Sequence, residues 1–143
     1  MKKKLAIASD HKGVELKEKI IEFLTDKKIS FIDLGTNSTE SVDYPEYSNK
    51  LTEIIIEERA QYGILICGTG VGMSIAANRS SSIRAALCFN SFMAQKSRQH
   101  NNANVLILGS QITDEKTSLE MIDVFLNTKF EGGRHIRRLS KIN

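Results

Sequence analysis

The sequence is poor in the residue types that define several protein classes. It has no tryptophan, one proline and two cysteines in 143 residues. Two cysteines are too few for a disulfide scaffold, and Cys67 and Cys88 lack the clustered spacing with histidine of a zinc site. No apolar run approaches the roughly 20 residues that span a bilayer. No repeat, linker or low-complexity segment interrupts the chain. These absences leave an ordinary globular protein.

The excess of one charge sign over the other is also small. The formal net charge is +3, which indicates a solvated mixed surface rather than a nucleic-acid-binding one. Residues 1–4 resemble the basic start of a signal peptide, but the apolar stretch 5–8 behind them is too short and runs into Asp10. We therefore expect a cytoplasmic protein. The length suits one domain over residues 1–143, with 130–143 as a C-terminal arm.

Short apolar runs alternate with amphipathic segments along the chain. The predicted strands are 5–8, 29–34, 63–67, 83–88 and 105–108. The predicted helices are 13–28, one starting near Pro45, 73–78, one capped by Ser91 that runs to about His100, and one capped by Thr113. Continuously apolar strands separated by helices predict a parallel sheet covered on both faces. The tail from Phe130 has no strong helical stripe, and the glycines at 132 and 133 predict a bent arm able to reach another subunit.

Polar residues gather where the predicted strands end. In open α/β sheets, ligands bind at the carboxyl ends of the strands. The residues at these ends are Asp10, His11, Gly35, Cys67, Gly68, Cys88, Gly109 and Ser110. We therefore expect most of the chemistry at one edge of the sheet.

The run from Tyr62 to Gly72 is the most informative segment, because an apolar strand ends at a cysteine and a glycine turn follows. A strand, a glycine turn and a helix start together build an anion site from backbone amides. A thiolate is favoured there, so Cys67 is predicted to be reactive rather than a small core residue. The turn is neither a P-loop nor a dinucleotide fingerprint, which favours a single phosphate or an oxyanion as its ligand. Cys88, which no glycine turn follows, is predicted to be structural.

Three further features each have a structural alternative. His11 at a strand tip can bind phosphate or relay a proton, but its segment is also a plain helix entry capped by Asp10. His100 ends a helix, where a histidine is often only a partner of the helix dipole. The tail arginines follow two flexible glycines and match phosphate oxygens, with a generic basic tail as the alternative.

Several sequence blocks together match a known family. In chain order they are Asp10-His11, Asp43-Tyr44-Pro45, Cys67 to Gly72, Ser74 to Asn78, Ser97 to Asn101, Asn104-Val105 with Gly109-Ser110, and Glu131 to His135. The chain closely resembles the type B ribose-5-phosphate isomerases, in the sugar-phosphate isomerase family that also contains the galactose-6-phosphate isomerase subunits. The resemblance covers nearly the whole chain, and blocks at matching spacings make it more specific than any single motif.

The resemblance implies a fold, an assembly and a reaction. The implied fold is a Rossmann-like three-layer α/β/α sandwich with a five-stranded parallel sheet. The implied assembly is a homodimer, often paired into tetramers, with each active site at the dimer interface. The implied reaction is the reversible aldose–ketose conversion of ribose 5-phosphate and ribulose 5-phosphate through an enediolate, without metal or organic cofactor.

The resemblance also implies a role for each site residue. Cys67 is the base, as a thiolate, and His100 opens the sugar ring with help from Thr69. The amides that hold the enediolate oxygens belong to Gly68, Thr69, Gly70, Val71 and Gly72. The other substrate contacts are Asp10, His11, Tyr44, Asn101, Arg134 and Arg138, with His11 and the two arginines on the phosphate.

Two positions distinguish this chain within the family. One branch lacks the cysteine and uses a glutamate where Met73 stands here, so Cys67 places the chain in the thiol branch. The family often has an arginine where Gln111 stands here, and a glutamine gives at most a neutral hydrogen bond. The phosphate contact of that arginine is therefore not carried over.

The sequence leaves three alternatives open. The first is the same chemistry on a six-carbon sugar phosphate, such as allose 6-phosphate or galactose 6-phosphate. Galactose-6-phosphate isomerases work as two different subunits that share the site groups, whereas Cys67 and His100 occur here in one polypeptide. The second is a non-catalytic phosphate- or nucleotide-binding module on the same fold. The third, a nucleic-acid binder, predicts a steep salt dependence and is least favoured; we expect neither nucleic-acid nor membrane partners.

Overall fold

The computed structural model describes residues 4–142, and its centre is a five-stranded parallel sheet of order β2-β1-β3-β5-β4. The strands are β1 (Leu5–Ser9), β2 (Phe31–Asp33), β3 (Tyr62–Cys67), β4 (Ala85–Leu87) and β5 (Val105–Gly109). The three inner strands are buried along their whole length, which is why they appear as continuous apolar runs. The predicted parallel sheet is confirmed.

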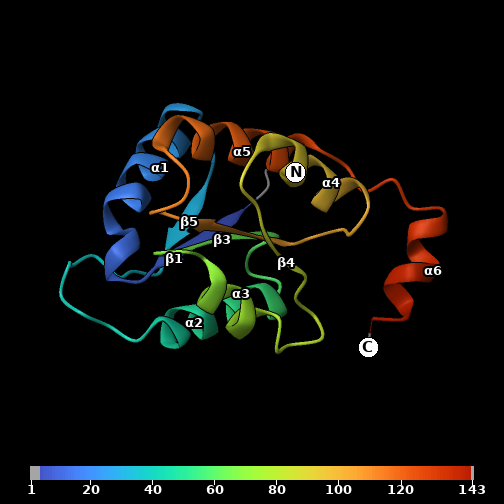
Figure 1. Ribbon diagram of the computed structural model, residues 1–143, viewed down its shortest axis with the longest axis horizontal. Helices are drawn as coiled ribbons and strands as arrows, with labels where there is room; N and C mark the ends of the chain where they lie inside the picture. Colours follow the sequence, from blue (N-terminus) through green and yellow to red (C-terminus); the bar gives the residue numbers. More distant parts are fainter. Residues whose placement is uncertain (1–3, 143) are drawn as a thin grey trace.

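Helices cover both faces of the sheet, as predicted (Figure 1). They are α1 (Val14–Asp26), α2 (Tyr44–Ile56), α3 (Val71–Ala77), α4 (Ser91–Gln99), α5 (Glu115–Asn127) and α6 (Arg134–Ser140), with a 3₁₀ turn, η1 (His11–Gly13), before α1. The first, fourth and fifth helices lie on one face, and α2 and α3 lie on the other. Within residues 4–142, no helix is both long and apolar enough to cross a membrane. The basic start at residues 1–3 lies outside the described residues.

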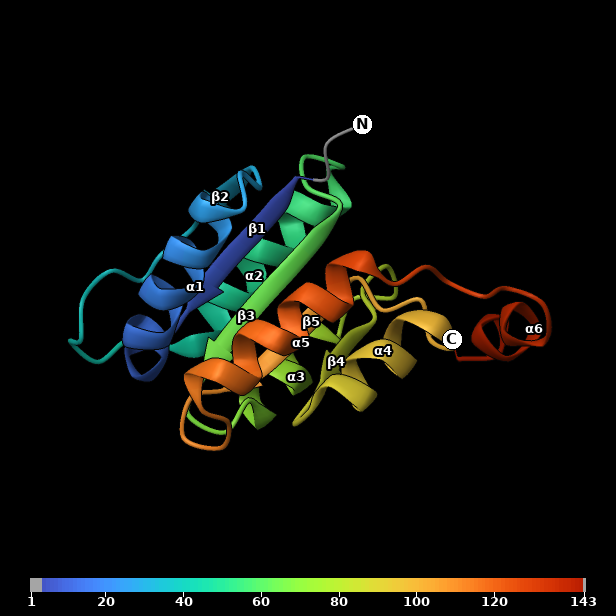
Figure 2. The same cartoon turned by 90° about the horizontal axis from the view of Figure 1, so that it is seen from above.

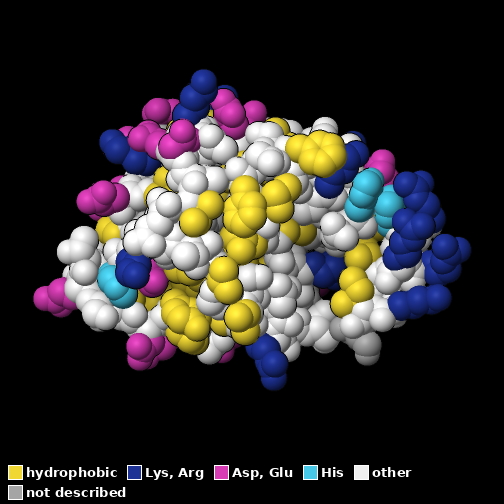
Figure 3. Space-filling view, in the orientation of Figure 1, with side chains coloured by type: hydrophobic (Ala, Val, Ile, Leu, Met, Phe, Trp, Pro, Cys, Tyr) yellow, Lys and Arg dark blue, Asp and Glu magenta, His cyan; other side chains and the backbone are white. Residues whose placement is uncertain are grey.

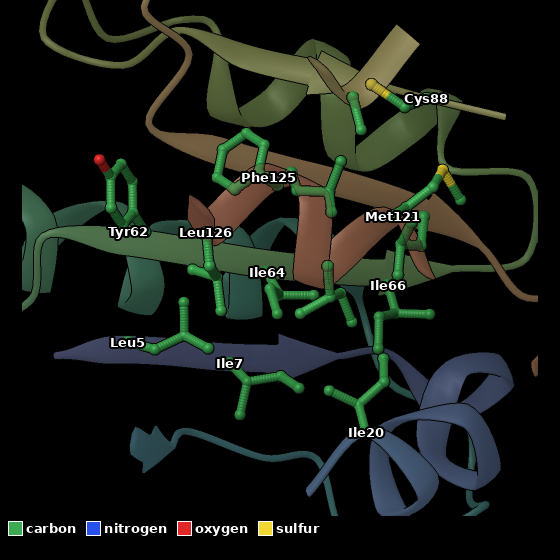
Figure 4. Packing of buried hydrophobic residues seen from close by; sticks show 14 of the residues in the cluster. Leu5, Ile7, Ile20, Tyr62, Ile64, Ile66, Cys88, Met121, Phe125 and Leu126 are labelled. Atoms are coloured by element: carbon green, nitrogen blue, oxygen red, sulfur yellow. The ribbon is translucent and has the colours of Figure 1, made fainter. Parts of the chain in front are cut away.

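The alternation of side chains along the strands divides the core into two clusters. Ile64 points toward α1 and α5, whereas Leu65 and Cys67 point toward α2 and α3. Figure 4 shows the first cluster, in which Phe125 of α5 meets Tyr62 edge-on with ring centroids 5.6 Å apart. Each large apolar side chain that is fully buried contributes about 1.5–3 kcal/mol. The same alternation places the thiol of Cys67 on the α2/α3 side of the sheet.

Two helices begin one residue away from their predicted caps. The side chain of Asn90, not Ser91, accepts a hydrogen bond of 2.9 Å from the amide three residues further on. At α5, the carboxylate of Asp114, not Thr113, accepts the corresponding bond at 2.8 Å. Both predicted caps, Ser91 and Thr113, are therefore wrong, because a neighbouring amide or carboxylate occupies the capping position.

The C-terminal arm bends at two glycines with positive φ, Gly132 (69°) and Gly133 (57°), as predicted. Beyond the bend the chain forms α6, which Figures 1 and 2 show standing away from the sandwich. The sequence did not predict this helix, because only His135 of α6 is buried and no apolar stripe is needed.

The strand order places the ends of β1 and β3 side by side at the carboxyl edge. Ser9 pairs with Ile66, and Cys67 pairs with Gly109 of β5. The strand order reverses at β1, with β2 on one side and β3 on the other. In doubly wound sheets such a switch point opens a crevice for ligands. The segments after β1 and β3 therefore border the same crevice.

Candidate active site

Cys67 and the turn that follows it form a tightly built unit. The backbone N–H of Gly70 donates a hydrogen bond of 3.2 Å to Sγ of Cys67, which is only 5% exposed. Gly70 adopts φ 85°, and a Cβ at this position would lie 2.5 Å from Cδ1 of Leu87. Only glycine fits both constraints, so the turn holds the sulfur against a backbone amide.

Two of the five amides predicted to hold the enediolate oxygens already have partners. The amide of Gly70 faces the sulfur, and the amide of Val71 donates to Oγ1 of Thr69 over 3.3 Å. Thr69 itself is exposed at the mouth of the turn. Thr69 is therefore an exposed residue of the turn, two positions after the thiol.

Tyr44 lies against the end of the same turn. A Cβ at Gly72 would come within 2.6 Å of Cζ of Tyr44, so the phenol ring packs directly on the glycine. Tyr44 is the first residue of α2 and remains 39% exposed. Its ring therefore lies against the turn that follows Cys67.

Asp10 and His11 follow β1 and border the crevice from its other side. The buried carboxylate of Asp10 accepts hydrogen bonds from the amides of Lys12 (3.0 Å) and Gly13 (3.2 Å), which confirms its capping role. Nδ1 of His11 accepts a bond of 3.2 Å from the amide of Val42. In the neutral imidazole, Nε2 therefore carries the proton and is the nitrogen left for a ligand.

Gln111, the position where the family often has an arginine, lies beside the turn. Its Oε1 is 3.1 Å from the place that a Cβ on Gly68 would occupy, and Cδ of Lys12 is equally close. The backbone of Gln111 also bonds to the carbonyl of Gly68 over 2.9 Å. The neutral side chain of Gln111 therefore lies beside the turn, at a position where an arginine would add a positive charge.

A second group of polar residues gathers around the end of α4. His100 ends this helix, and its ring stacks on that of His135 with centroids 4.3 Å apart and planes 16° apart. Oε1 of Glu131 lies 3.5 Å from Nε2 of His100 and 3.8 Å from Nε2 of His135. Burial lowers the pKa of His135, and the charges of His100, Arg134 and Arg138 lower it further, while Glu131 raises it. Sequence reasoning missed Glu131 and His135 as partners of His100.

His100, Glu131 and His135 are also residue types that bind metal ions. Their possible ligand atoms all lie within 4.8 Å of one another. Within residues 4–142, these three residues form the one cluster of histidine, cysteine and acidic side chains that is close enough to hold a metal ion. A metal ion lies in the plane of each imidazole that binds it, and two stacked, nearly parallel rings do not share such a position. The neighbouring Arg134 and Arg138 also oppose a cation. This arrangement does not fit a bound metal.

The predicted site residues fall into two halves within one chain. Around the ends of β1 and β3 lie Asp10, His11, Tyr44 and residues 67–72; around α4 and α6 lie His100, Asn101, Arg134 and Arg138. Figures 1 and 2 show α1 and α6 at opposite ends of the molecule, and Figure 3 shows basic and histidine side chains gathered at the α6 end. One chain therefore does not bring the predicted phosphate contacts His11, Arg134 and Arg138 together.

The arm half also borders a groove. A cavity of about 420 Å³ lies between α6 and the segments around β4, lined among others by Arg84, Asn101 and Leu139. Asn101 is exposed at its rim, one residue after His100. The arm half thus presents its polar groups outward rather than toward the crevice of the same chain.

Comparison with known proteins agrees with this architecture. A model of the ribose/galactose isomerase family matches residues 5–142. This chain belongs to the ribose/galactose isomerase family. Among family members, a Rickettsia conorii protein named as a sugar phosphate isomerase is 57% identical over 138 residues, covering 96% of each chain. Ribose-5-phosphate isomerase B of Escherichia coli is 43% identical over 140 residues, covering 98% of this chain and 94% of its own.

Solved structures of the family share the whole fold. A ribose 5-phosphate isomerase from Thermotoga maritima superposes with a TM-score of 0.97 at 51% identity, covering 99% of this chain and 98% of its own. Ribose-5-phosphate isomerase B from Mycoplasma genitalium, with bound ribulose 5-phosphate, has a TM-score of 0.94 at 42% identity, covering 99% of this chain and 95% of its own. The predicted Rossmann-like sandwich is confirmed.

Proposed function

We propose that this protein is a ribose-5-phosphate isomerase that interconverts ribose 5-phosphate and ribulose 5-phosphate, with Cys67 as the catalytic base. The observation that carries this proposal is the thiol at the end of β3, which meets the glycine turn at the switch point of the sheet. Membership of the ribose/galactose isomerase family supports the reaction class. The named activity of relatives that match over nearly the whole chain supports the substrate.

The proposed reaction moves one proton between neighbouring carbons. The thiolate of Cys67 takes the proton from C2 of the open-chain aldose, and the electron pair moves toward O1 to give an enediolate. Return of the proton to C1, with transfer of a proton between the two oxygens, yields the ketose. The turn amides that have no internal partner stabilise the negative oxygens. The loss of one such donor typically costs about 10²–10³ in rate.

The remaining groups act on the ring and the phosphate. His100, assisted by Thr69, opens the furanose ring, since ribose 5-phosphate is mostly cyclic in solution. His11, Arg134 and Arg138 bind the phosphate, which arginine forks match in geometry. Because His11 and the arginines lie at opposite ends of one chain, the proposed site needs a second copy. Each site then combines the residues around the ends of β1 and β3 of one subunit (the turn half) with the residues around α4 and α6 of its partner (the arm half).

An exposed apolar surface supports this homodimer. Val71 and Ile75 of α3 are 52% and 64% exposed, and Phe92 of α4 is 66% exposed. Apolar side chains crowd the middle of the face in Figure 3. Several large exposed apolar side chains on one face of the molecule favour an interaction site there. Because α3 begins directly after the turn, a partner that covers it also reaches the crevice at Cys67.

A coupled assay on the purified protein tests the function. We expect conversion of ribose 5-phosphate to ribulose 5-phosphate, with kcat/KM higher than for allose 6-phosphate or galactose 6-phosphate. A preference for a six-carbon substrate would replace the pentose assignment and keep the chemistry. No turnover of any of the three, together with tight nucleotide binding in calorimetry, would indicate a non-catalytic binding module.

A further inference from the structure

The C-terminal arm is fastened to α4 one residue before His100. The backbone N–H of Glu131 donates a hydrogen bond of 3.0 Å to the carbonyl of Gln99. After the glycine bend, the N–H of His135 donates to the carbonyl of Gly132 over 3.1 Å. These bonds carry the side chains of Glu131 and His135 to the ring of His100.

The ring of His135 is fixed in a nearly closed environment. The residue is 4% exposed, and the ring of Phe130 lies 6.5 Å from it on a tilted plane. Its Nε2 is buried and makes no hydrogen bond with the described residues, and Oε1 of Glu131 lies 3.8 Å away. A buried polar atom without a partner costs free energy and calls for an explanation.

The stack requires that one of its two rings stay neutral. Two imidazolium rings 4.3 Å apart would repel each other, and Arg134 and Arg138 add positive charge on the same side. His135 is buried, whereas the side chain of His100 is 34% exposed. His135 is therefore the ring that stays neutral, and His100 is the ring that reaches solvent.

Glu131 determines which nitrogen of His100 is available. A carboxylate only accepts hydrogen bonds, so the nitrogen that faces it, Nε2 at 3.5 Å, carries the hydrogen. The tautomer of a histidine is set by the hydrogen bond that its other nitrogen makes. Nδ1 is then left free, as an acceptor in the neutral ring.

We propose that Glu131 and His135 are positioning residues for His100, which keep its ring plane fixed and present Nδ1 to the sugar. This inference rests on the proposed function. Nδ1 takes the proton of the hydroxyl on C1 and returns it to the ring oxygen as the C1–O4 bond breaks, so one proton moves and none is consumed. While the proton is on His100, the carboxylate of Glu131 stabilises the imidazolium, as the buried aspartate does in a catalytic triad.

The orientation can be measured without turnover. The chain has three histidines, so their side-chain NMR signals are assignable. In the wild-type protein without substrate, we expect ring-current shifts on the ring protons of His100 that are retained in His135→Phe and lost in His135→Leu. If the ring protons of His100 in the wild type have the chemical shifts of a solvent-exposed histidine, the proposal is overturned, whatever the protein catalyses.

A double-mutant comparison tests the catalytic consequence. We expect Glu131→Gln to lower kcat for ribose 5-phosphate about ten- to hundredfold, the range seen when partners that orient a functional imidazole are removed, with KM little changed. The same change in a His100→Asn background should cost nothing further, because its effect passes through His100. Glu120→Gln, on the exposed face of α5, is the matched control and should leave kcat unchanged.

The alternative outcomes are distinct. An equal loss in both backgrounds would show that Glu131 acts on stability rather than on His100, and so overturn the proposal. A rise in KM with unchanged kcat would show that Glu131 acts on phosphate binding by Arg134 and Arg138 rather than on His100. This result would also overturn the proposal. If the wild type does not isomerise ribose 5-phosphate, the proposed function fails, and the NMR experiment still decides the orientation of His100.

Discussion

The backbone amide of Gly70 donates a hydrogen bond of 3.2 Å to Sγ of Cys67. A donor aimed at sulfur interacts more strongly with a thiolate than with a neutral thiol, since hydrogen bonds to ionised acceptors are the stronger ones. The positive φ of Gly70 makes this contact possible, and strand alternation turns the thiol toward the α2/α3 layer. This geometry supports the role that we propose for Cys67.

Replacing Cys67 with alanine should abolish most of the isomerase activity. Removal of a general base usually costs about 10²–10⁴ in rate, so we expect kcat in the coupled assay to fall within that range while the melting temperature changes little. The matched control is Cys88→Ala, which removes a thiol from the other core cluster and should stay active. Activity of Cys67→Ala within about tenfold of wild type would show that the thiol is not the base.

Mixing two inactive variants should restore activity if the site spans two subunits. Cys67→Ala damages the turn half, and His100→Asn damages the arm half. A mixed dimer then contains one intact site, so equal amounts that exchange freely should recover about a quarter of wild-type activity. Mixing Cys67→Ala with Asp10→Asn is the control, because both changes affect the same half and no intact site forms. Equal, low activity in both mixtures would place the whole site in one chain.

A charge on the exposed face of α3 should separate the subunits. Ile75 is 64% exposed in the second turn of α3, so Ile75→Asp should convert dimers to monomers in analytical ultracentrifugation and lower kcat/KM together with the dimer fraction. Ile56→Asp, at the end of α2, is the control and should do neither. A monomeric variant with full activity would contradict the interfacial site.

The positions of Cys67 and Asp10 at one edge could be predicted from sequence, because the ends of parallel strands meet there. The strand boundaries were less accurate at the sheet edges. The run 83–88 forms a strand only over Ala85–Leu87, at the edge of the sheet. Residue patterns alone gave no reason to pair His100 with Cys67, because the fold of one chain keeps the two halves apart; that expectation came from the family resemblance.

Contacts that depend on a tertiary bend were also beyond the sequence pattern. Glu131 and His135 belong to a sequence block that matches the family. Their approach to His100, however, requires the bend at Gly132 and the hydrogen bond from the amide of Glu131 to the carbonyl of Gln99. Lys17 offers a second example, since lysines are almost never fully buried unless paired. Its complete burial in α1 depends on a partner in β2, which helical periodicity does not reveal.

Cys88 should be unreactive toward alkylating reagents at neutral pH. Burial raises the pKa of this thiol to about 11, and a hydrogen bond with Ser97 offsets only part of the effect. At pH 8 about a thousandth of the thiol is ionised, so Cys67→Ala, in which Cys88 is the remaining cysteine, should react with iodoacetamide about a hundredfold more slowly when folded than when unfolded in urea. The folded-state rate should rise with pH toward 11. Similar rates in the two states would contradict the burial.

The same shift has a consequence for stability. Because the folded pKa of Cys88 lies above the reference value of 9.0, the folded state retains a proton that the unfolded chain releases. The stabilisation is complete below about pH 9 and is lost as pH rises toward 11. Cys88→Ala should therefore remove part of the decline in the free energy of unfolding across this interval, as measured by urea denaturation. An identical decline in the variant would show that other groups cause it.

The buried Lys17 should make Asp33 more important for stability than Lys17 itself. Nζ of Lys17, which is fully buried, lies 2.8 Å from Oδ1 of Asp33 and 2.8 Å from Oδ1 of Asn37. Asp33→Asn leaves a buried cation without its counter-charge, and because the Asp33 side chain is 28% exposed we expect a cost below the roughly 3–5 kcal/mol of a fully buried pair. Lys17→Met removes the charge and keeps most of the volume, so it should cost less, and adding it to Asp33→Asn should recover stability. Urea denaturation of the three variants measures this order. A larger loss in Lys17→Met than in Asp33→Asn would show that the ion pair itself, rather than the avoidance of a lone buried charge, stabilises this end of the sheet.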